Sequence, residues 1–265
     1  NYTLRAIDAR NLDIDDVVFC SGIGCSSRLP GYIEADGLHT THGRAIAFAT
    51  GVKFASPELT VIVFTGDGDM AGIGGNHFIH AARRNMDMTV ICVNNFNYGM
   101  TGGQVSPTTP VEGISTTTPF GNLEEPFDLC RLAIGAGAPF VARWTMGYPY
   151  ETVAAVEAAI RTAGFGFVEI LAPCPTGFGR SNQQRDATDR DPYAAAEYLE
   201  SSDPSGRARR QEGNRLSKGK GRAPGPASPP EFPDTDRQIA RYSARSASSF
   251  STSCGNTMPV PRQRP

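Results

Sequence analysis

Two apolar segments of strand length, each ending in a polar motif, constrain the fold of this 265-residue chain more than any other feature. The run at 60–65 (TVIVFT) ends at Gly66-Asp67-Gly68, and the run at 89–93 (TVICV) ends at Asn94-Asn95. Continuous apolar runs of this length are typical of strands that are buried on both faces of a parallel sheet. We therefore expect both polar motifs at the carboxyl edge of such a sheet, where α/β proteins bind their ligands.

The rest of the first 202 residues alternates in the same way. Strands that alternate with helices predict an α/β fold, in which a parallel sheet is flanked by helices. A further helix is expected over 192–200, with Pro192 in its first turn. The other expected elements are a short helical pattern followed by a strand within 3–19, helices over 42–55, 74–84, 126–136 and 150–163, and strands over 139–145 and 166–171.

The composition of the chain changes near residue 203. Residues 1–202 carry 13 Lys or Arg against 22 Asp or Glu, whereas 203–265 carry 12 against 5 and include nine prolines. The second region has no apolar periodicity, so we expect a basic, low-complexity tail that is disordered. Its charge is compatible with binding to an acidic partner, and its composition is also compatible with a shift of the reading frame.

Several protein classes are excluded by the same counts. No apolar run approaches the roughly 18 to 20 residues of a membrane span, and residues 1–5 contain no apolar signal-peptide core. Six cysteines are too few for a disulfide scaffold and suit a reducing compartment. We expect a cytoplasmic protein without a membrane or nucleic-acid partner.

The two polar motifs have the chemistry of a magnesium–diphosphate site. Asp67 offers a carboxylate oxygen, Asn95 an amide oxygen, and the backbone carbonyl of Asn97 a third oxygen. Proteins usually hold Mg²⁺ with one or two carboxylates together with ligand phosphates. The glycines allow the backbone to approach a diphosphate closely, and the N-terminus of the next helix is suited to anions.

A dinucleotide-binding loop is the competing interpretation, since Gly66-x-Gly68-x-x-Ala71 loosely matches that fingerprint. It would place two carboxylates, Asp67 and Asp69, beside a pyrophosphate without a metal. The second strand should also end in an acidic residue that binds the ribose, and it ends in asparagine. Two tight turns without a ligand are a third possibility, which leaves the pairing of Asp with Asn unexplained.

The longer segments around these motifs resemble the β subunits of 2-oxoacid:ferredoxin oxidoreductases, which bind thiamine diphosphate, and are nearest to the 2-oxoglutarate synthase type. The resemblance covers about residues 1–176. Its segments are SGIGCSSR (21–28), HTTHGRA (39–45), TGDGD (65–69), GGNHFIHAARR (74–84) and NNFNYGMTGGQ (94–104).

This resemblance implies specific residue roles. Asp67, Asn95 and the carbonyl of Asn97 match the Mg²⁺ ligands. Cys25 and Cys174 match two of the four cysteines that bind a [4Fe–4S] cluster. The other two belong to a Cys-Pro-x-Cys-Gly segment expected directly before Asn1, which this chain does not contain. The positions that match contacts to thiamine diphosphate are Ile23, Gly24, Cys25, Ser26, His42, Gly43, Gly68, Asp69, Gly99 and Met100.

The implied activity is the oxidative decarboxylation of 2-oxoglutarate, with the acyl group passed to coenzyme A and electrons passed through the cluster to ferredoxin. An α subunit supplies the activating glutamate in this family, so no catalytic acid or base is assigned to this chain. Two alternatives stay open. One is a thiamine diphosphate-dependent decarboxylase without redox chemistry, and the other is an inactive, truncated fragment.

The remaining cysteines and histidines favour structural roles. Cys20, Cys92 and Cys130 fall within predicted strands or helices and are expected in the core. His77 and His80 lie on one predicted helix without a third metal ligand. His42 is expected to contact diphosphate or substrate, whereas Cys254 lies in the tail and has no assigned role.

Overall fold

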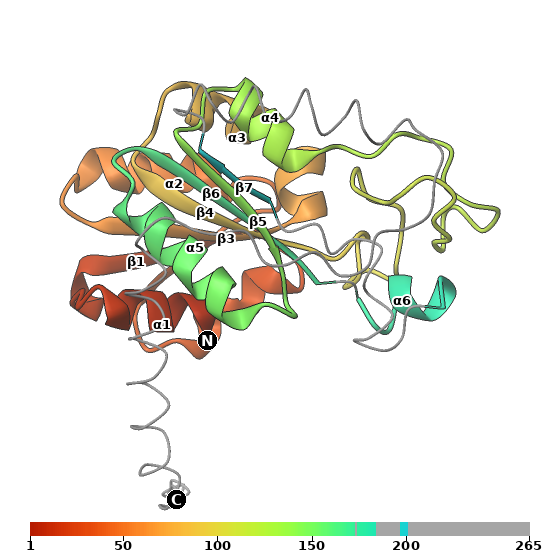
Figure 1. Ribbon diagram of the computed structural model, residues 1–265, viewed down its shortest axis with the longest axis horizontal. Coiled ribbons are helices and arrows are strands. Elements are labelled where there is room, and N and C mark those ends of the chain that lie inside the picture. The colour runs from red at the N-terminus through yellow and green to blue at the C-terminus, as the bar shows by residue number, and fades with distance from the viewer. Residues whose placement is uncertain (173, 184–196, 201–265) are drawn as a thin grey trace, which may run out of the picture. The chain divides into compact units, whose positions relative to one another are not determined.

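A mixed sheet is the centre of the computed structural model, which describes residues 1–172, 174–183 and 197–200 (Figure 1). The strand order is β2-β1-β3-β4-β6-β5-β7, and every pairing is parallel except that of β5 with β7. The predicted α/β fold is confirmed. The strands are β1 (Val17–Ser21), β2 (Asp36–His39), β3 (Thr60–Gly66), β4 (Met88–Asn94), β5 (Phe140–Thr145), β6 (Phe165–Leu171) and β7 (Glu197–Glu200). The helices are α1 (Tyr2–Ala9), α2 (Ala45–Ala55), α3 (Gly75–Arg83), α4 (Leu129–Gly135), α5 (Pro149–Arg161) and α6 (Phe178–Ser181).

Helices cover both faces of the sheet. Helices α2, α3 and α4 pack on one face, and α1 and α5 pack on the other (Figure 1). The central strand β3 shows why its sequence is continuously apolar. Val61 and Val63 enter the first core, and Ile62 and Phe64 enter the second, because successive side chains point to opposite faces. Burial on both faces thus requires apolar residues at every position.

Three segments differ from the sequence-based expectation. The edge strand β2 was not expected, and neither was the π-helical turn η3 (Gly68–Ile73), which lies between Asp67 and the predicted helix α3. The helix expected over 192–200 is wrong for 197–200, because this segment pairs with the edge of β5 and sheet pairing overrides its helical pattern. Residues 192–196 and the predicted tail at 203–265 lie outside the described residues.

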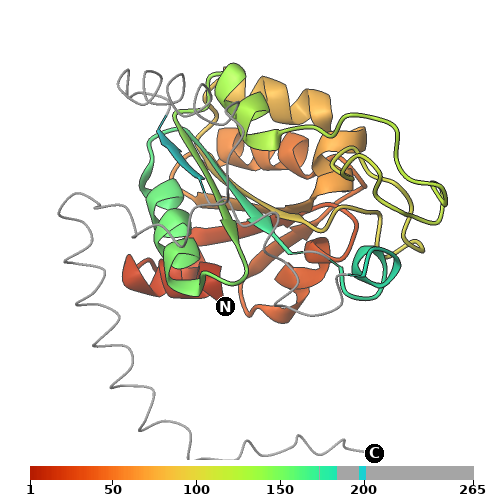
Figure 2. The ribbon, with the colours of Figure 1, turned by 45° about the vertical axis from the view of Figure 1, so that its right-hand side comes forward.

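The connection between β4 (ending at Asn94) and α4 (beginning at Leu129) is a long loop. The segment between β4 and α4 extends past the sheet and lies beside α6, as the hydrogen bond from Ile114 N–H to Asn182 Oδ1 (2.8 Å) records (Figure 2). A short 3₁₀ segment, η2 (Ser26–Tyr32), precedes β2 on the other side. In the part of the chain that the structure describes, no helix has the length and apolar character needed to cross a bilayer.

Candidate functional site

The ends of β3 and β4 meet, as the sequence predicts. The two strands are parallel neighbours with Gly66 opposite Val93, so Asp67 and Asn95 follow at the same edge. The Asn95 backbone N–H lies 3.4 Å from Asp67 Oδ1. The carboxylate and the amide predicted to act together are therefore adjacent.

The carboxylate of Asp67 is almost completely buried, and its other oxygen is held by a polar loop. Oδ2 accepts hydrogen bonds from Ser106 Oγ (2.5 Å) and Thr108 Oγ1 (2.7 Å). Burial raises the pKa of Asp67, and these two hydroxyl donors oppose that rise. Sequence reasoning missed Ser106 and Thr108, because a loop rich in hydroxyl residues carries no periodicity that would place it against Asp67.

The side-chain amide of Asn95 lies near two other oxygen atoms, Asp67 Oδ1 and the Asn97 carbonyl oxygen. With its amide nitrogen turned inward, Asn95 donates to Asp67 Oδ1 (3.0 Å) and to the Asn97 carbonyl (2.7 Å). A rotation of the amide by 180° places an oxygen there instead. Asp67 Oδ1, Asn95 Oδ1 and the Asn97 carbonyl then converge, and this is a donor set suited to a hard cation such as Mg²⁺. The residues present thus fit the predicted metal.

A second buried carboxylate, that of Asp69, joins the loops around this edge. Asp69 Oδ1 accepts hydrogen bonds from the backbone N–H groups of Gly43 (2.6 Å) and Ile23 (3.3 Å), and Oδ2 accepts one from Thr65 Oγ1 (2.8 Å). His42 Nδ1 lies 2.9 Å from Asp69 Oδ1. The carboxylate of Asp69 therefore holds the loops at Ile23 and Gly43 to the end of β3, and its contact to thiamine diphosphate stays a prediction.

Glycines are required at this edge because other atoms occupy the space of a side chain. A Cβ at Gly68 would overlap the ring of Tyr98, whose hydroxyl donates to the Gly68 carbonyl (3.3 Å). Gly43 has φ +71°, and its Cβ would overlap Ile73. Tyr98 also stacks at an angle near His42, with ring centroids 6.1 Å apart. Tyr98 is a second site residue that sequence reasoning did not single out.

The predicted cluster ligands Cys25 and Cys174 approach the same side chain. A Cβ at Gly99 would lie 3.4 Å from Cys25 Sγ and 3.2 Å from Asn97 Oδ1. One at Gly177 would lie 2.5 Å from Asn97 Nδ2 and 3.4 Å from Cys174 Sγ. The buried Asn97 amide has no hydrogen-bond partner at either atom. Cys25 and Cys174 thus lie on two sides of the Asn97 side chain, and their role as cluster ligands stays a prediction.

The described residues do not complete that cluster site. No group of three or more His, Cys, Asp or Glu side chains gathers as a metal site in the ranges that the structure describes. A [4Fe–4S] cluster is held by four thiolates, and Cys25 and Cys174 supply two of them. The described residues therefore supply two of the four thiolates that a [4Fe–4S] cluster needs.

The other predicted site residues also lie at this edge. Ile23 to Ser26 form the loop after β1, where Gly24 has φ +141°. Exposed fractions of 40% for Ile23 and 47% for Met100 leave both side chains accessible. Their contacts to a cofactor stay predictions.

The prediction that three of the other cysteines lie in the core is confirmed, and the structural roles of His77 and His80 stay predictions. Cys20, Cys92 and Cys130 are buried in the core, as predicted. His80 accepts a hydrogen bond from Arg83 Nε on the same helix (3.4 Å), and Cys254 lies outside the described residues.

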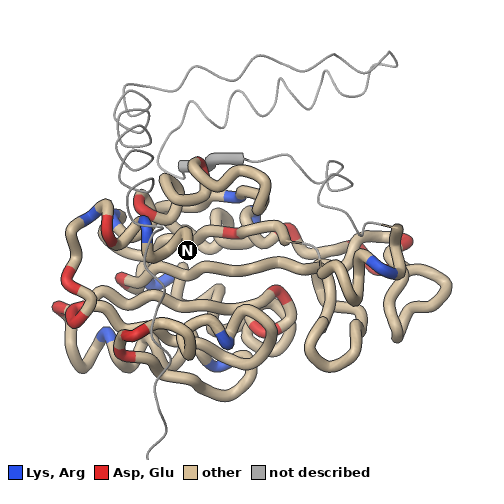
Figure 3. Tube along the Cα trace, turned by 90° about the horizontal axis from the view of Figure 1, so that it is seen from below, with Lys and Arg blue, Asp and Glu red and all other residues tan. Residues whose placement is uncertain are grey.

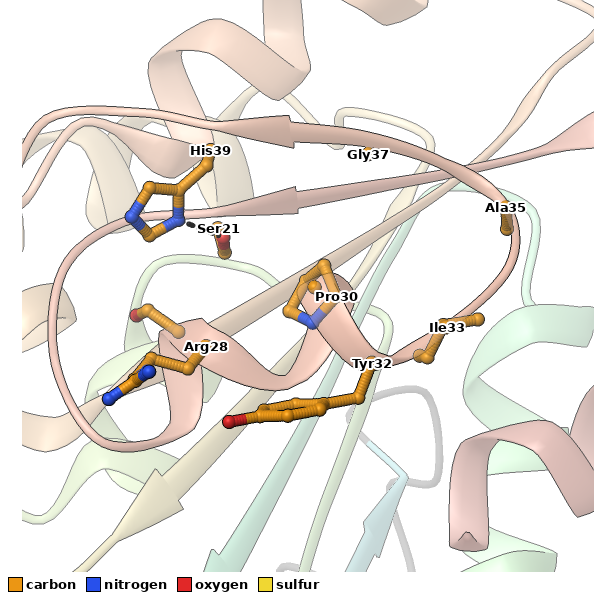
Figure 4. Close-up of a pocket in the computed structure, with 10 residues that line it drawn as sticks. Ser21, Arg28, Pro30, Tyr32, Ile33, Ala35, Gly37 and His39 are labelled. Carbon is orange, nitrogen blue, oxygen red and sulfur yellow. Dashed lines mark hydrogen bonds between the residues drawn. The ribbon is translucent and has the colours of Figure 1, made fainter. Parts of the chain in front are cut away.

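A cavity of about 590 Å³ lies between η2 and β2 (Figure 4). Its lining includes Ser21, Arg28, Tyr32 and His39, and the Ser21 hydroxyl lies 2.9 Å from His39 Nδ1. Figure 4 shows the Arg28 and His39 side chains at the same end of this cavity. Ser27, which also lines this cavity, directly follows the predicted contact residue Ser26 in the sequence.

Comparison with known proteins agrees with this geometry. Residues 22–170 match the family described as thiamine pyrophosphate enzyme, C-terminal TPP binding domain. The chain is 57% identical over 189 residues to the 2-oxoglutarate synthase subunit KorB of Methanocaldococcus jannaschii, covering 71% of this chain and 70% of that subunit. It is 45% identical to the 2-oxoacid:ferredoxin oxidoreductase subunit beta of Saccharolobus solfataricus, covering 65% and 57%.

A solved structure supports the same relationship. A 2-oxoglutarate:ferredoxin oxidoreductase from Magnetococcus marinus, with 2-oxoglutarate, coenzyme A and succinyl-CoA bound, is 32% identical and has a TM-score of 0.67. The match covers 91% of this chain and 87% of that one. The fold and site thus define a thiamine pyrophosphate enzyme. Within that class, the chain belongs to the family of 2-oxoacid:ferredoxin oxidoreductase β subunits.

The length of the match differs between relatives. The chain covers 65% of the 2-oxoglutarate synthase subunit KorB of Methanothermobacter marburgensis, to which it is 55% identical. It covers 64% of the corresponding subunit of Archaeoglobus fulgidus. The chain thus spans about two thirds of the length of these relatives.

Proposed function

We propose that this chain is the thiamine diphosphate-binding β subunit of an enzyme that oxidatively decarboxylates 2-oxoglutarate in the presence of coenzyme A and ferredoxin. The observation that carries the proposal is the convergence of Asp67 Oδ1, the Asn95 amide and the Asn97 carbonyl at the carboxyl edge of the sheet. The 2-oxoglutarate synthase names of relatives at 54 to 57% identity support this substrate.

The chain's own residues bind and orient the cofactor. Asp67, Asn95 and the Asn97 carbonyl would hold Mg²⁺, and the loops fixed by Asp69 would surround the diphosphate. When bound, thiamine diphosphate supplies an electron sink for the carbon–carbon bond that breaks as CO₂ leaves. Ser106 and Thr108 cover Asp67 Oδ2 and keep water away from this oxygen.

The positively charged side chain of Arg28, which lines the cavity, supports a substrate with two carboxylates. 2-Oxoglutarate differs from pyruvate in its second carboxylate, and Arg28 presents a guanidinium at the cavity lining. A guanidinium binds carboxylates with two parallel hydrogen bonds, which favours recognition of this group. We expect Arg28→Met to raise the KM for 2-oxoglutarate more than it lowers kcat.

The redox part of the proposal depends on Cys25 and Cys174. The two thiols would supply two ligands of a [4Fe–4S] cluster, whose remaining ligands are not among the described residues. An α subunit and ferredoxin would complete the enzyme, and a cytoplasmic location suits thiolate ligands. A decarboxylase without redox chemistry would need the same Mg²⁺ ligands but neither cysteine.

Binding and turnover measurements on the full chain, co-expressed with its α subunit and purified anaerobically, test these proposals. Calorimetry with thiamine diphosphate and Mg²⁺ should show metal-dependent binding that Asp67→Asn weakens at least about 10-fold. His80→Asn, on an exposed part of α3, serves as the control. Dye reduction should require coenzyme A and be faster with 2-oxoglutarate than with pyruvate.

Each outcome addresses a separate part of the proposal. Equal binding by wild type and Asp67→Asn would refute the assigned metal site. Equal rates with the two substrates, or activity with pyruvate alone, would refute the substrate assignment. Metal-dependent cofactor binding in a sample that contains no iron would favour the non-redox decarboxylase.

A further inference from the structure

Two oppositely charged residues lie on neighbouring strands of the sheet, among the Lys, Arg, Asp and Glu positions that Figure 3 marks along the chain. Arg143 of β5 and Glu169 of β6 are opposite one another on neighbouring strands. Arg143 Nε donates to Glu169 Oε2 at 2.7 Å, and the exposed fractions of the two side chains are 19% and 1%. A buried ion pair is weak evidence for stability, because desolvation offsets most of the attraction. A contribution to stability therefore does not explain this ion pair.

The second oxygen of Glu169 determines how Asn94 is oriented. Asn94, the last residue of β4, donates from Nδ2 to Glu169 Oε1 (2.8 Å). An ionised carboxylate only accepts hydrogen bonds, so the amide nitrogen of Asn94 must face Glu169. Asn94 Oδ1 consequently faces the opposite side, where it accepts from the Phe96 N–H (3.1 Å) and lies 2.9 Å from Thr108 Oγ1.

Thr108 continues this path to the metal ligand. A hydroxyl has one hydrogen, so Thr108 Oγ1 shares it between two acceptors in a three-centre hydrogen bond, with Asn94 Oδ1 at 2.9 Å and Asp67 Oδ2 at 2.7 Å. Glu169, Asn94, Thr108 and Asp67 are all buried, so water does not compete for the hydrogen bonds among them. With Oδ2 held in this way, the other oxygen of Asp67 faces the Asn95 amide and the Asn97 carbonyl.

The other end of the path is fixed at the start of α4. Arg143 donates from a terminal guanidinium nitrogen to Asp128 Oδ1 (2.6 Å). Asp128 also caps α4 by accepting from the Arg131 N–H (3.1 Å). The guanidinium is thus held between two carboxylates, and its orientation toward Glu169 has little freedom.

We propose that Glu169 and Arg143 are positioning residues for the Mg²⁺–diphosphate site. They set the amide orientation of Asn94, whose oxygen shares the Thr108 hydroxyl hydrogen with Asp67 Oδ2. This three-centre contact fixes the position of Oδ2 and leaves Asp67 Oδ1 for the metal. This inference rests on the proposed function, since it assumes that Mg²⁺ binds at Asp67. The chain of contacts runs Arg143–Glu169–Asn94–Thr108–Asp67.

The test measures Mg²⁺ affinity in the co-expressed complex by calorimetry at saturating thiamine diphosphate. Replacement of residues behind a metal ligand typically lowers metal affinity about 10- to 100-fold, and we expect this range for Glu169→Gln and Thr108→Val. Thr108→Ser keeps the hydroxyl and should retain affinity near that of wild type. Asp87→Asn removes a different ion pair, with Lys53 at 2.8 Å, and is the matched control for Glu169→Gln.

A double variant distinguishes the path from two independent effects. If Glu169 acts through Asn94 and Thr108, the Glu169→Gln/Thr108→Val double variant should bind Mg²⁺ about as weakly as Thr108→Val alone. Fully additive losses, or wild-type affinity in both single variants, would overturn the inference. A merely structural role would lower the unfolding temperature without changing Mg²⁺ affinity.

Two further outcomes are kept apart. If Glu169→Gln does not fold, the comparison of Thr108→Val with Thr108→Ser still decides whether the hydroxyl matters, and equal affinities would refute the path. If wild type itself shows no Mg²⁺-dependent binding, the proposed function fails at Asp67, and this result is separate from any effect of Glu169.

Discussion

Replacement of Gly43 by alanine should destabilise the fold through two separate effects. Gly43 has φ +71°, and an L-residue held in that region costs about 1–3 kcal/mol. The added Cβ would also overlap the Ile73 side chain and lie 2.9 Å from the Gly74 nitrogen. Overpacking of this kind costs about 1–3 kcal/mol, and here the backbone of η3 and α3 limits the relief available. We expect Gly43→Ala to lower the free energy of unfolding by about 2–6 kcal/mol.

Gly51→Ala is the matched control, because Gly51 lies within α2 and a Cβ there would meet nothing within 4 Å. Alanine should stabilise that helix by about 0.5–1 kcal/mol. Urea unfolding of both variants without ligand gives the two free energies on one scale. A Gly43→Ala protein within about 1 kcal/mol of wild type would refute the argument, since neither strain nor overlap would then be present.

Two further predictions concern charge and thiol chemistry. Burial raises the pKa of Asp128. The charge of Arg143 and the hydrogen bond from the Arg131 N–H together lower it by more, so the pKa of Asp128 lies below its ordinary value. The resulting stabilisation is present above the unfolded pKa of about 3.9 and is lost as pH falls below it. Asp128→Asn keeps the helix cap and should be about 0.5–1 kcal/mol less stable near pH 7, a difference that disappears in acid denaturation curves. Iodoacetamide followed by mass spectrometry should label Cys174 before Cys25, because hydrogen bonds from Thr176 and Gly177 outweigh burial and lower the Cys174 pKa, whereas burial raises that of Cys25. The buried Cys20, Cys92 and Cys130 should react only in urea, and their labelling in the native protein would contradict the described core.

The strands that the sequence indicates most clearly are those buried on both faces. β3, β4 and β6 are apolar nearly throughout, and their order along the chain is enough to bring Asp67 and Asn95 together. β2 (DGLH) could not be predicted in this way, because it is a mostly exposed edge strand with little apolar pattern. Its position depends on backbone pairing with β1, which leaves no mark on side-chain composition.

The part of the site that could be predicted is the part that follows directly from the strand ends. Glycines and oxygen ligands at strand ends are local signals, so Asp67 and Asn95 were identified from spacing. Ser106 and Thr108 reach Asp67 from 39 and 41 residues away through a loop without periodic structure. Contacts of that range depend on how the loop folds back over the sheet, and no short sequence pattern encodes this path.

The single carboxylate of Asp69 has a consequence for the energetics of cofactor binding. It accepts hydrogen bonds from Ile23, Gly43 and Thr65, so the loops around the diphosphate region are ordered by the same buried group. Their conformational entropy is lost when the chain folds, and a ligand does not have to order them again on binding. In hydrogen exchange, the amides of Ile23 and Gly43 should open as one cooperative unit, with protection that reports on a preorganised pocket in the cofactor-free protein.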